Sequence, residues 1–253
     1  MQISEFQCLS PDKIKYDGVG FIIPPTLKDI LQLGTNEYGK NVYDHYINLL
    51  SIDVNQYLSI LPDKDVLLSM LSDEEKANLK IFDLWSISYE NIKPIIESLS
   101  FFIFGCLKYD EVNNQIIIYD KDVYCGSVDR NNFDELRKFI LKLNYISDEM
   151  IEKPKFKNKA AEELYYKLQQ HEAESNKNTK KDLSLYNVVS SLCSYHNSIN
   201  ISNVWSLTVY QLYDQFFRQN MKNQLDISAM RWSTWGSESF DFDLWFKSLT
   251  KGG

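Results

Sequence analysis

Three histidines are the first residues to consider for chemistry. His45, His171 and His196 are not arranged in the His-x-x-x-His or His-Glu-x-x-His spacing of zinc hydrolases. We interpret all three as structural residues. His196 falls at the predicted end of a helix, which it would stabilise when protonated. The spacing therefore predicts no zinc site.

Two further pairs of residues have side chains capable of catalysis or metal binding. Cys193 and His196 lie about one helical turn apart, but a cysteine nucleophile also needs a third orienting group and an open pocket. Asp241 and Asp243 form a lone Asp-x-Asp, a pattern that can hold a divalent cation. Acidic residues also favour the start of a helix, and we prefer that interpretation here. With no nucleophile elbow or phosphate-binding motif present, we expect no catalytic residue, metal or cofactor, and we expect that the protein is not an enzyme.

The charge is unevenly distributed along the chain. The 253 residues have a net charge of −8. Residues 1–175 hold 19 basic and 29 acidic residues, whereas residues 176–253 hold 8 and 6. The acidic balance disfavours binding to nucleic acid or to anionic membranes. The more neutral final part is the better candidate for a contact surface.

The segment patterns predict an intracellular chain with reduced cysteines. No stretch of 18 apolar residues is present, so we expect no transmembrane helix. The first residues, MQISEFQCLSPDK, lack the pattern of a signal peptide. The four cysteines, at positions 8, 106, 125 and 193, are therefore not expected to form a disulfide framework.

Hydrophobic periodicity predicts a mainly α (α+β) fold. A short β segment is expected at 14–23, around Asp17-Gly18, and one β-hairpin at 101–128, turning at Asn113-Asn114. Helices are predicted in the following segments: 26–34, 38–50, 54–61, 63–71, from 72 onward, 89–100, 132–144, 158–173, 184–195, 208–218 and 241–249.

Helix-capping signals support several of these boundaries. Thr26 is expected to cap the helix that Gly34 ends. Capping boxes are predicted for three pairs of residues: Ser72 with Glu75, Asn132 with Glu135, and Thr208 with Gln211. Asp182 or Ser184 is expected to cap the helix at 184–195.

A charged stretch divides the predicted domains. Residues 172–182, EAESNKNTKKD, contain no large apolar residue. We predict an acidic, mainly helical domain over 1–173 that includes the hairpin. A charged linker follows over 174–182, and a small aromatic-rich helical domain over 183–253.

Residues 204–221, VWSLTVYQLYDQFFRQNM, concentrate the aromatic side chains of the final domain. One face of this helix is expected to pack against the helix at 184–195, because consecutive helices with a short connection usually pack together. The other aromatic residues exceed what a small domain needs for its own core. They either pack onto the larger domain or form a surface for a partner or a second copy. The residues assigned to that surface are Trp205, Tyr210, Phe217, Trp232, Trp235 and Trp245.

The order of these features resembles a group of proteins encoded in the tail gene clusters of phages and prophages of Firmicutes, described as tail proteins or tail assembly chaperones. The segments that carry the resemblance are PPTLKDILQLG, YINLLSIDVNQYL, LSDEEKANLKIFDLW, NNQIIIYDKDVY, ELRKFI, KPKFKNKAAEELYYKL, LYNVVSSLCSYHNSINISNVWSLTVYQLYDQFFRQ and DLWFKSL. The resemblance is most specific at 158–218 and 241–249. Residues 226–240 are more aromatic than the group leads us to expect.

The resemblance implies a non-enzymatic phage protein in the host cytoplasm. A tail assembly chaperone coats the helical tape-measure protein and helps to recruit tail-tube subunits. Grooves lined by apolar and aromatic residues suit such a client, since they accept amphipathic helices. The alternative is a structural tail or baseplate component that is retained in the virion.

Overall fold

The computed structural model describes residues 3–36, 41–61, 64–146 and 184–236 of the 253-residue chain. Eleven α-helices and two small antiparallel sheets lie within these ranges. The predicted α+β fold class is therefore confirmed. The predicted helices at 158–173 and 241–249, and the linker at 174–182, lie outside the described residues.

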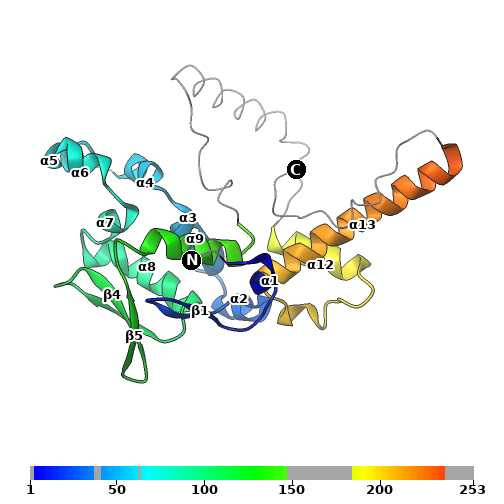
Figure 1. Cartoon of the computed structure of the whole chain (residues 1–253), viewed down its shortest axis with the longest axis horizontal. Helices are drawn as coiled ribbons and strands as arrows, with labels where there is room; N and C mark the ends of the chain where they lie inside the picture. The colour runs from blue at the N-terminus through cyan, green and yellow to red at the C-terminus, as the bar shows by residue number, and fades with distance from the viewer. Residues whose placement is uncertain (1–2, 37–40, 62–63, 147–183, 237–253) are drawn as a thin grey trace, which may run out of the picture.

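The N-terminal segment forms a hairpin between two short helices (Figure 1). Helix α1 spans Glu5–Cys8, strands β1 and β2 span Ile14–Tyr16 and Gly20–Ile22, and α2 spans Leu27–Leu33. Strands β1 and β2 pair antiparallel, and Gly18 has a positive φ of 78° in their turn. Glycine adopts this conformation without a steric penalty, which explains the predicted Asp17-Gly18 turn. The predicted β segment at 14–23 is confirmed, and it forms a hairpin.

A series of helices follows, and several of them are short. They are α3 (Val42–Ser51), α4 (Val54–Ile60), α5 (Lys64–Met70), α6 (Asp73–Ala77), α7 (Ile81–Trp85) and α8 (Tyr89–Phe102). The predicted capping box of α6 is confirmed, because Ser72 Oγ accepts from Glu75 N and the Glu75 carboxylate accepts from Ser72 N. Helices α4, α5 and α6 lie at the end of the molecule opposite α13 (Figure 1).

The second β region has one strand more than predicted. It forms a three-stranded antiparallel sheet in the order β3 (Cys106–Asp110), β4 (Gln115–Asp120) and β5 (Val123–Val128). The predicted turn at Asn113-Asn114 is confirmed, but a second turn, at Lys121 and Asp122, was missed. Both of these residues have positive φ, of 46° and 72°, in a turn without the glycine that usually marks such a conformation. The predicted start at residue 101 was also too early, since Phe101 and Phe102 end α8.

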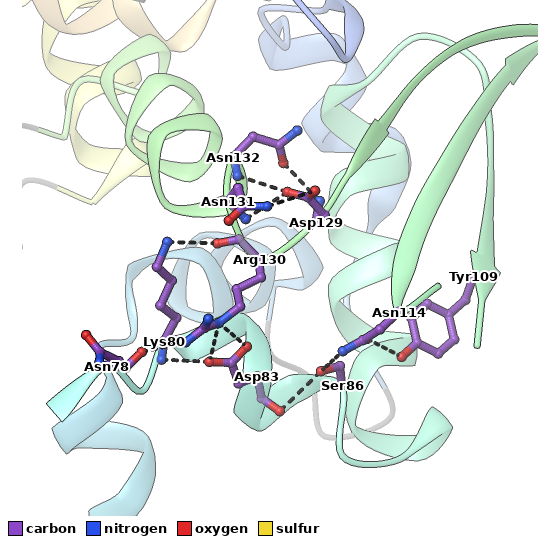
Figure 2. Close-up of polar contacts among 10 residues, drawn as sticks. All are labelled: Asn78, Lys80, Asp83, Ser86, Tyr109, Asn114, Asp129, Arg130, Asn131 and Asn132. Atoms are coloured by element: carbon purple, nitrogen blue, oxygen red, sulfur yellow. Dashed lines mark hydrogen bonds and ion pairs between the residues drawn. The ribbon is translucent and has the colours of Figure 1, made fainter. Parts of the chain in front are cut away.

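Helix α9 (Phe133–Leu143) has a different N-terminal arrangement from the one predicted. Asn132 occupies the cap position but makes no side-chain capping bond. Instead, Asp129 Oδ1 accepts from the backbone N–H groups of Asn131 and Asn132. The Asn132 amide accepts from Asp129 N (Figure 2). It also donates to the Ser127 carbonyl. The predicted Asn132 cap with Glu135 is therefore wrong, because Asn132 closes the loop that precedes the helix.

The last described elements are α12 (Leu185–Tyr195), the 3-10 helix η2 (Val204–Ser206) and α13 (Val209–Trp235). The predicted capping box at Thr208 and Gln211 is confirmed. Helix α13 packs against α12, as predicted, and also against α9. Leu212 belongs to the same buried core as Leu136 of α9. The described residues on the two sides of the predicted linker thus share one core.

Candidate partner-binding site

An apolar groove of about 750 Å³ lies between α2, α12 and the loop that leads into η2. Its innermost side chains are buried: Leu27 and Ile30 from α2, and Val189 from α12. Apolar side chains remain exposed at its edge, where Leu31, Tyr186 and Ile201 have exposed fractions of 64%, 79% and 58%. Among the described residues that line the groove, none carries a charge; the polar ones are Thr35, Asn41, Ser190, Ser194 and Asn200. Such a surface fits an apolar ligand or the apolar face of a helix.

Backbone pairing fixes one wall of the groove to the start of α13. Thr26 and Thr208, the N-caps of α2 and α13, form an antiparallel β-bridge. Leu27 N donates to the Leu207 carbonyl at 2.9 Å, and Val209 N donates to the Pro25 carbonyl at 3.3 Å. These bonds join residues far apart in the sequence, so the wall formed by α2 is positioned before any partner binds.

The structure separates the predicted partner-binding residues. Trp205 lines the groove, and its Nε1 donates to the Ile201 carbonyl at 2.8 Å. Trp232 and Trp235 lie on the distal half of α13, where they are 51% and 77% exposed. Trp245 lies outside the described residues.

Tyr210 and Phe217 instead belong to an aromatic cluster at the proximal end of α13. Tyr210 is only 3% exposed, so its assignment to a partner surface was wrong. Its ring lies 5.1 Å from that of Tyr145, and Phe217 stacks on the same ring at 5.5 Å between centroids. Tyr210 is buried because Tyr145, which follows α9, packs against it. The periodicity of α13 does not reveal this contact.

Sequence reasoning missed the exposed groove residues Leu31, Tyr186 and Ile201. Tyr186 lies beside, and not within, the apolar stripe of α12 that contains Val188, Val189 and Leu192. An apolar residue off the buried stripe of a short helix is the signal that would have identified it. A groove built from α2 and α12 was not predictable from either helix alone.

Three of the candidate catalytic residues, His196, Cys193 and His45, lie in the described part of the chain. His196 Nδ1 accepts from the backbone N–H groups of Ser198 and Ile199, at 3.2 and 3.0 Å, and so shapes the turn after α12. Burial raises the pKa of the Cys193 thiol, which disfavours the nucleophilic thiolate. His45 is exposed on α3. His171, Asp241 and Asp243 lie outside the described residues.

A polar hollow of about 470 Å³ lies at the other end of α12, beside α13. Asp214 is mostly buried there and faces Arg218, with 3.6 Å between Asp214 Oδ1 and Arg218 Nε. Burial raises the pKa of the Asp214 carboxyl, and the Arg218 charge opposes that shift. Across the described residues, no group of three or more histidine, cysteine or acidic side chains is placed to hold a metal.

A polar network joins the loop before α9 to α7 (Figure 2). Arg130 Nε donates to Asp83 Oδ2 at 2.9 Å, and Arg130 Nη2 donates to the Asn78 carbonyl at 2.7 Å. Lys80 Nζ donates to the Arg130 carbonyl at 3.1 Å. Asn114 continues the contacts toward the β3–β4 turn, donating to Ser86 Oγ at 3.1 Å. Because these side chains bond to other groups of the protein, we interpret the network as stabilising the fold.

Replacing Arg130 tests that structural assignment. We expect Arg130→Leu to lower the free energy of unfolding by about 1 kcal/mol, because the side chain is half-exposed and the ion pair is partly screened. Urea denaturation measures the change. Arg231→Leu, at an exposed position of α13, is the control and should leave stability unchanged. Equal stability of the two variants would contradict the assignment.

Comparison with known proteins shows that the final part of the chain is similar to a phage-derived family. Residues 176–250 match a family model described as the YomV second domain, a family of the Bacillus prophage type. The match is consistent with a phage protein, and it includes α12, η2 and α13 but not α2. No curated protein and no solved structure matches the chain. None of the helices in the described parts is long and apolar enough to cross a membrane.

Proposed function

We propose that this protein is a non-enzymatic phage tail assembly chaperone that acts in the host cytoplasm. Its clients are the tape-measure protein and, through it, the tail-tube subunits. The observation that carries the proposal is the groove between α2 and α12, whose described lining residues are uncharged and whose edge exposes Leu31, Tyr186 and Ile201. The phage-derived family match supports the biological setting.

The chemistry of the groove suits one face of an amphipathic helix. Such a helix presents apolar side chains at i, i+3 or i+4, and i+7, which can fill a groove lined by Leu, Ile, Val and Trp. Aromatic residues make efficient anchors because they bury a large area with few rotatable bonds. The acidic residues of 1–175 would keep a complex with an aggregation-prone client soluble.

Co-expression with the tape-measure protein of the same gene cluster tests the proposal. We expect a soluble complex on tag pull-down, and precipitation of the tape-measure protein when it is expressed alone. The double substitution Tyr186→Ala and Ile201→Ser should reduce the recovered client at least about tenfold, the effect of losing roughly 1.4 kcal/mol of binding free energy.

A matched control uses an apolar side chain far from the groove. Val112 is 92% exposed in the β3–β4 turn, so Val112→Ser should leave client recovery unchanged. Because the three substituted side chains are mostly exposed, circular dichroism and thermal unfolding should match the wild type. Equal recovery with the groove variant and the control would refute the groove as the client site.

Mass spectrometry of purified virions distinguishes the alternative function. A chaperone should be absent from the particle, whereas a structural tail or baseplate component should be present in it. A protein that binds no client and is found in virions would favour the structural role.

A further inference from the structure

The distal half of α13 carries an apolar stripe with a spacing of its own. Near the start of the helix, Tyr210, Tyr213 and Phe217 surround Tyr145. From Met221 onward the stripe residues are separated by four, three, four and three positions: Met221, Leu225, Ser228, Trp232 and Trp235. A strict alternation of four and three is the seam of a two-helix coiled coil.

The spacing of this seam is self-complementary for two antiparallel helices. Met221 and Trp235 lie seven residues before and after Ser228, and Leu225 and Trp232 lie three before and four after it. Two copies crossing at Ser228 would therefore place each Trp235 opposite Met221, and each Trp232 opposite Leu225. The small side chain of Ser228 lets the two backbones approach where they cross.

The exposed area of the seam is large enough for a reversible contact. Trp232 and Trp235 are 51% and 77% exposed, and the end of α13 extends past α12 (Figure 1). At about 250 Å² for a fully exposed tryptophan, they leave roughly 320 Å² of surface in each copy and roughly 640 Å² in two. A specific interface needs about 1,000 Å² in total, so the tryptophans supply more than half and the remaining seam residues add to it. The result is a small, weak interface.

The charge distribution favours contact at this end of the molecule. The seam has no ionisable residue, and the nearby Lys222 is paired with Asp226 on the same helix. The acidic residues are concentrated in 1–175, so two copies that met through that part would repel each other. Antiparallel pairing of 221–235 separates the two bodies by about 20 Å of helix, at 1.5 Å per residue. That separation exceeds the Debye length of about 8 Å at physiological salt.

We propose that two copies of this chain form a dimer through antiparallel pairing of residues 221–235 of α13. The groove between α2 and α12 lies at the opposite end of α13 and stays open in both copies. A dimer therefore carries two grooves, and two sites on one long helical client would be bound with increased overall affinity. The dimer does not depend on the proposed chaperone function.

Sedimentation equilibrium of the full chain, from low to high micromolar concentration, tests the association. We expect the average mass to rise toward twice that of the monomer. The double substitution Trp232→Ala and Trp235→Ala should weaken dimerisation at least about tenfold. Met230→Ala, at a position that is 63% exposed but off the seam, is the matched control and should dimerise like the wild type.

Engineered cysteines test the orientation of the two helices. Ser228→Cys should form a disulfide-linked dimer on mild oxidation, in a background where the exposed Cys106 and Cys125 are replaced by serine. Leu225→Cys should not, because antiparallel pairing sets the two copies of position 225 about 10 Å apart along the helix. Asn223→Cys, on the side of α13 opposite the seam, controls for random collision.

Several results would overturn the proposal. Equal cross-linking at 225 and 228 indicates parallel helices, and cross-linking at 228 no faster than at 223 indicates no specific pairing. A full chain that stays monomeric at every concentration, while a chain ending at Gly236 dimerises, identifies its own last residues as the cover of the seam. Sedimentation of the Tyr186→Ala and Ile201→Ser variant, whose seam is intact, reports on the dimer without the groove, and its client pull-down reports on the groove, so failure of one proposal is distinguishable from failure of the other.

Discussion

Gly126→Ala is expected to lower the free energy of unfolding by about 3 kcal/mol, near the upper end of the usual cost of overpacking. A Cβ at position 126 would lie 2.2 Å from the carbonyl oxygen of Gly18 and 2.8 Å from the Cα of Val19. Both of these atoms belong to the backbone, so no side-chain rotation can remove the clash. Strand β5 and the β1–β2 turn would have to separate.

Separating strand β5 from the β1–β2 turn would also break a hydrogen bond and expose a buried side chain. Ser127 N donates to the Gly18 carbonyl at 2.9 Å, and this bond ties the three-stranded sheet to the β1–β2 hairpin. Val19, next to Gly18, is fully buried. A shift large enough to accept a methyl group would break the hydrogen bond and expose Val19. The hairpin leads directly into α2, so the groove wall would also be disturbed.

Gly18→Ala provides the matched control on the other side of the same contact. Gly18 has a φ of +78°, but no atom of the described residues lies within 4 Å of an added Cβ. The cost should therefore be limited to backbone strain of about 1 kcal/mol. Urea denaturation of both variants measures the difference, and a loss at position 126 no greater than that at position 18 would show that the backbone can yield.

Local signals in the sequence were sufficient for features whose physical cause is local. The capping boxes at Ser72 and Thr208 depend on residues three apart, and both are present. The turn at Lys121-Asp122 was missed because the sequence YDKDVY contains no glycine, the residue that usually indicates a left-handed backbone conformation. The capping box of Asn132 with Glu135 was predicted wrongly because Asp129 accepts from the Asn132 N–H that Glu135 would have bonded, and the local pattern does not rank the two acids.

The candidate site depends on contacts between distant residues, which periodicity does not encode. The groove exists because Thr26 and Thr208 form a bridge across 182 residues of sequence. Likewise, the aromatic stripe of α13 looks uniform in the sequence, yet Tyr210 is buried and Trp235 is exposed. The stripe changes character along the helix because Tyr145 packs against its proximal rings and does not reach the distal ones.

Tyr145→Ala is expected to cost about 3 kcal/mol of stability, the low end of the range for truncating a core aromatic side chain, because Tyr145 is only partly buried. The Tyr145 ring contacts three aromatic rings of α13, with centroid distances of 5.1 Å to Tyr210, 5.5 Å to Tyr213 and 5.5 Å to Phe217. Its loss would leave a cavity between the end of α9 and α13. Hydrogen exchange should then increase in the proximal half of α13, next to the groove.

Tyr145→Phe separates the ring from its hydroxyl group. The Tyr145 hydroxyl is buried without a hydrogen-bond partner among the described residues, so removing it relieves a desolvation cost. We expect Tyr145→Phe to be at least as stable as the wild type at neutral pH. A loss comparable to that of the alanine variant would mean that the hydroxyl, and not the ring, holds α13.

The wild type and Tyr145→Phe are also expected to differ in stability at alkaline pH. Burial, and secondarily the Asp214 charge, raise the pKa of Tyr145 to about 12, whereas an unfolded tyrosine titrates near pH 10. Because the folded pKa is the higher one, the stability that the neutral Tyr145 hydroxyl contributes is fully present below about pH 10 and is lost as pH rises toward 12. Phenylalanine cannot ionise, so Tyr145→Phe should lose less stability over that interval.

Urea denaturation at neutral and alkaline pH measures the difference between the two proteins, which cancels the contribution of tyrosines that both retain. Parallel alkaline losses would place the Tyr145 hydroxyl in contact with solvent and leave its aromatic ring as the only part that fixes α13 to α9.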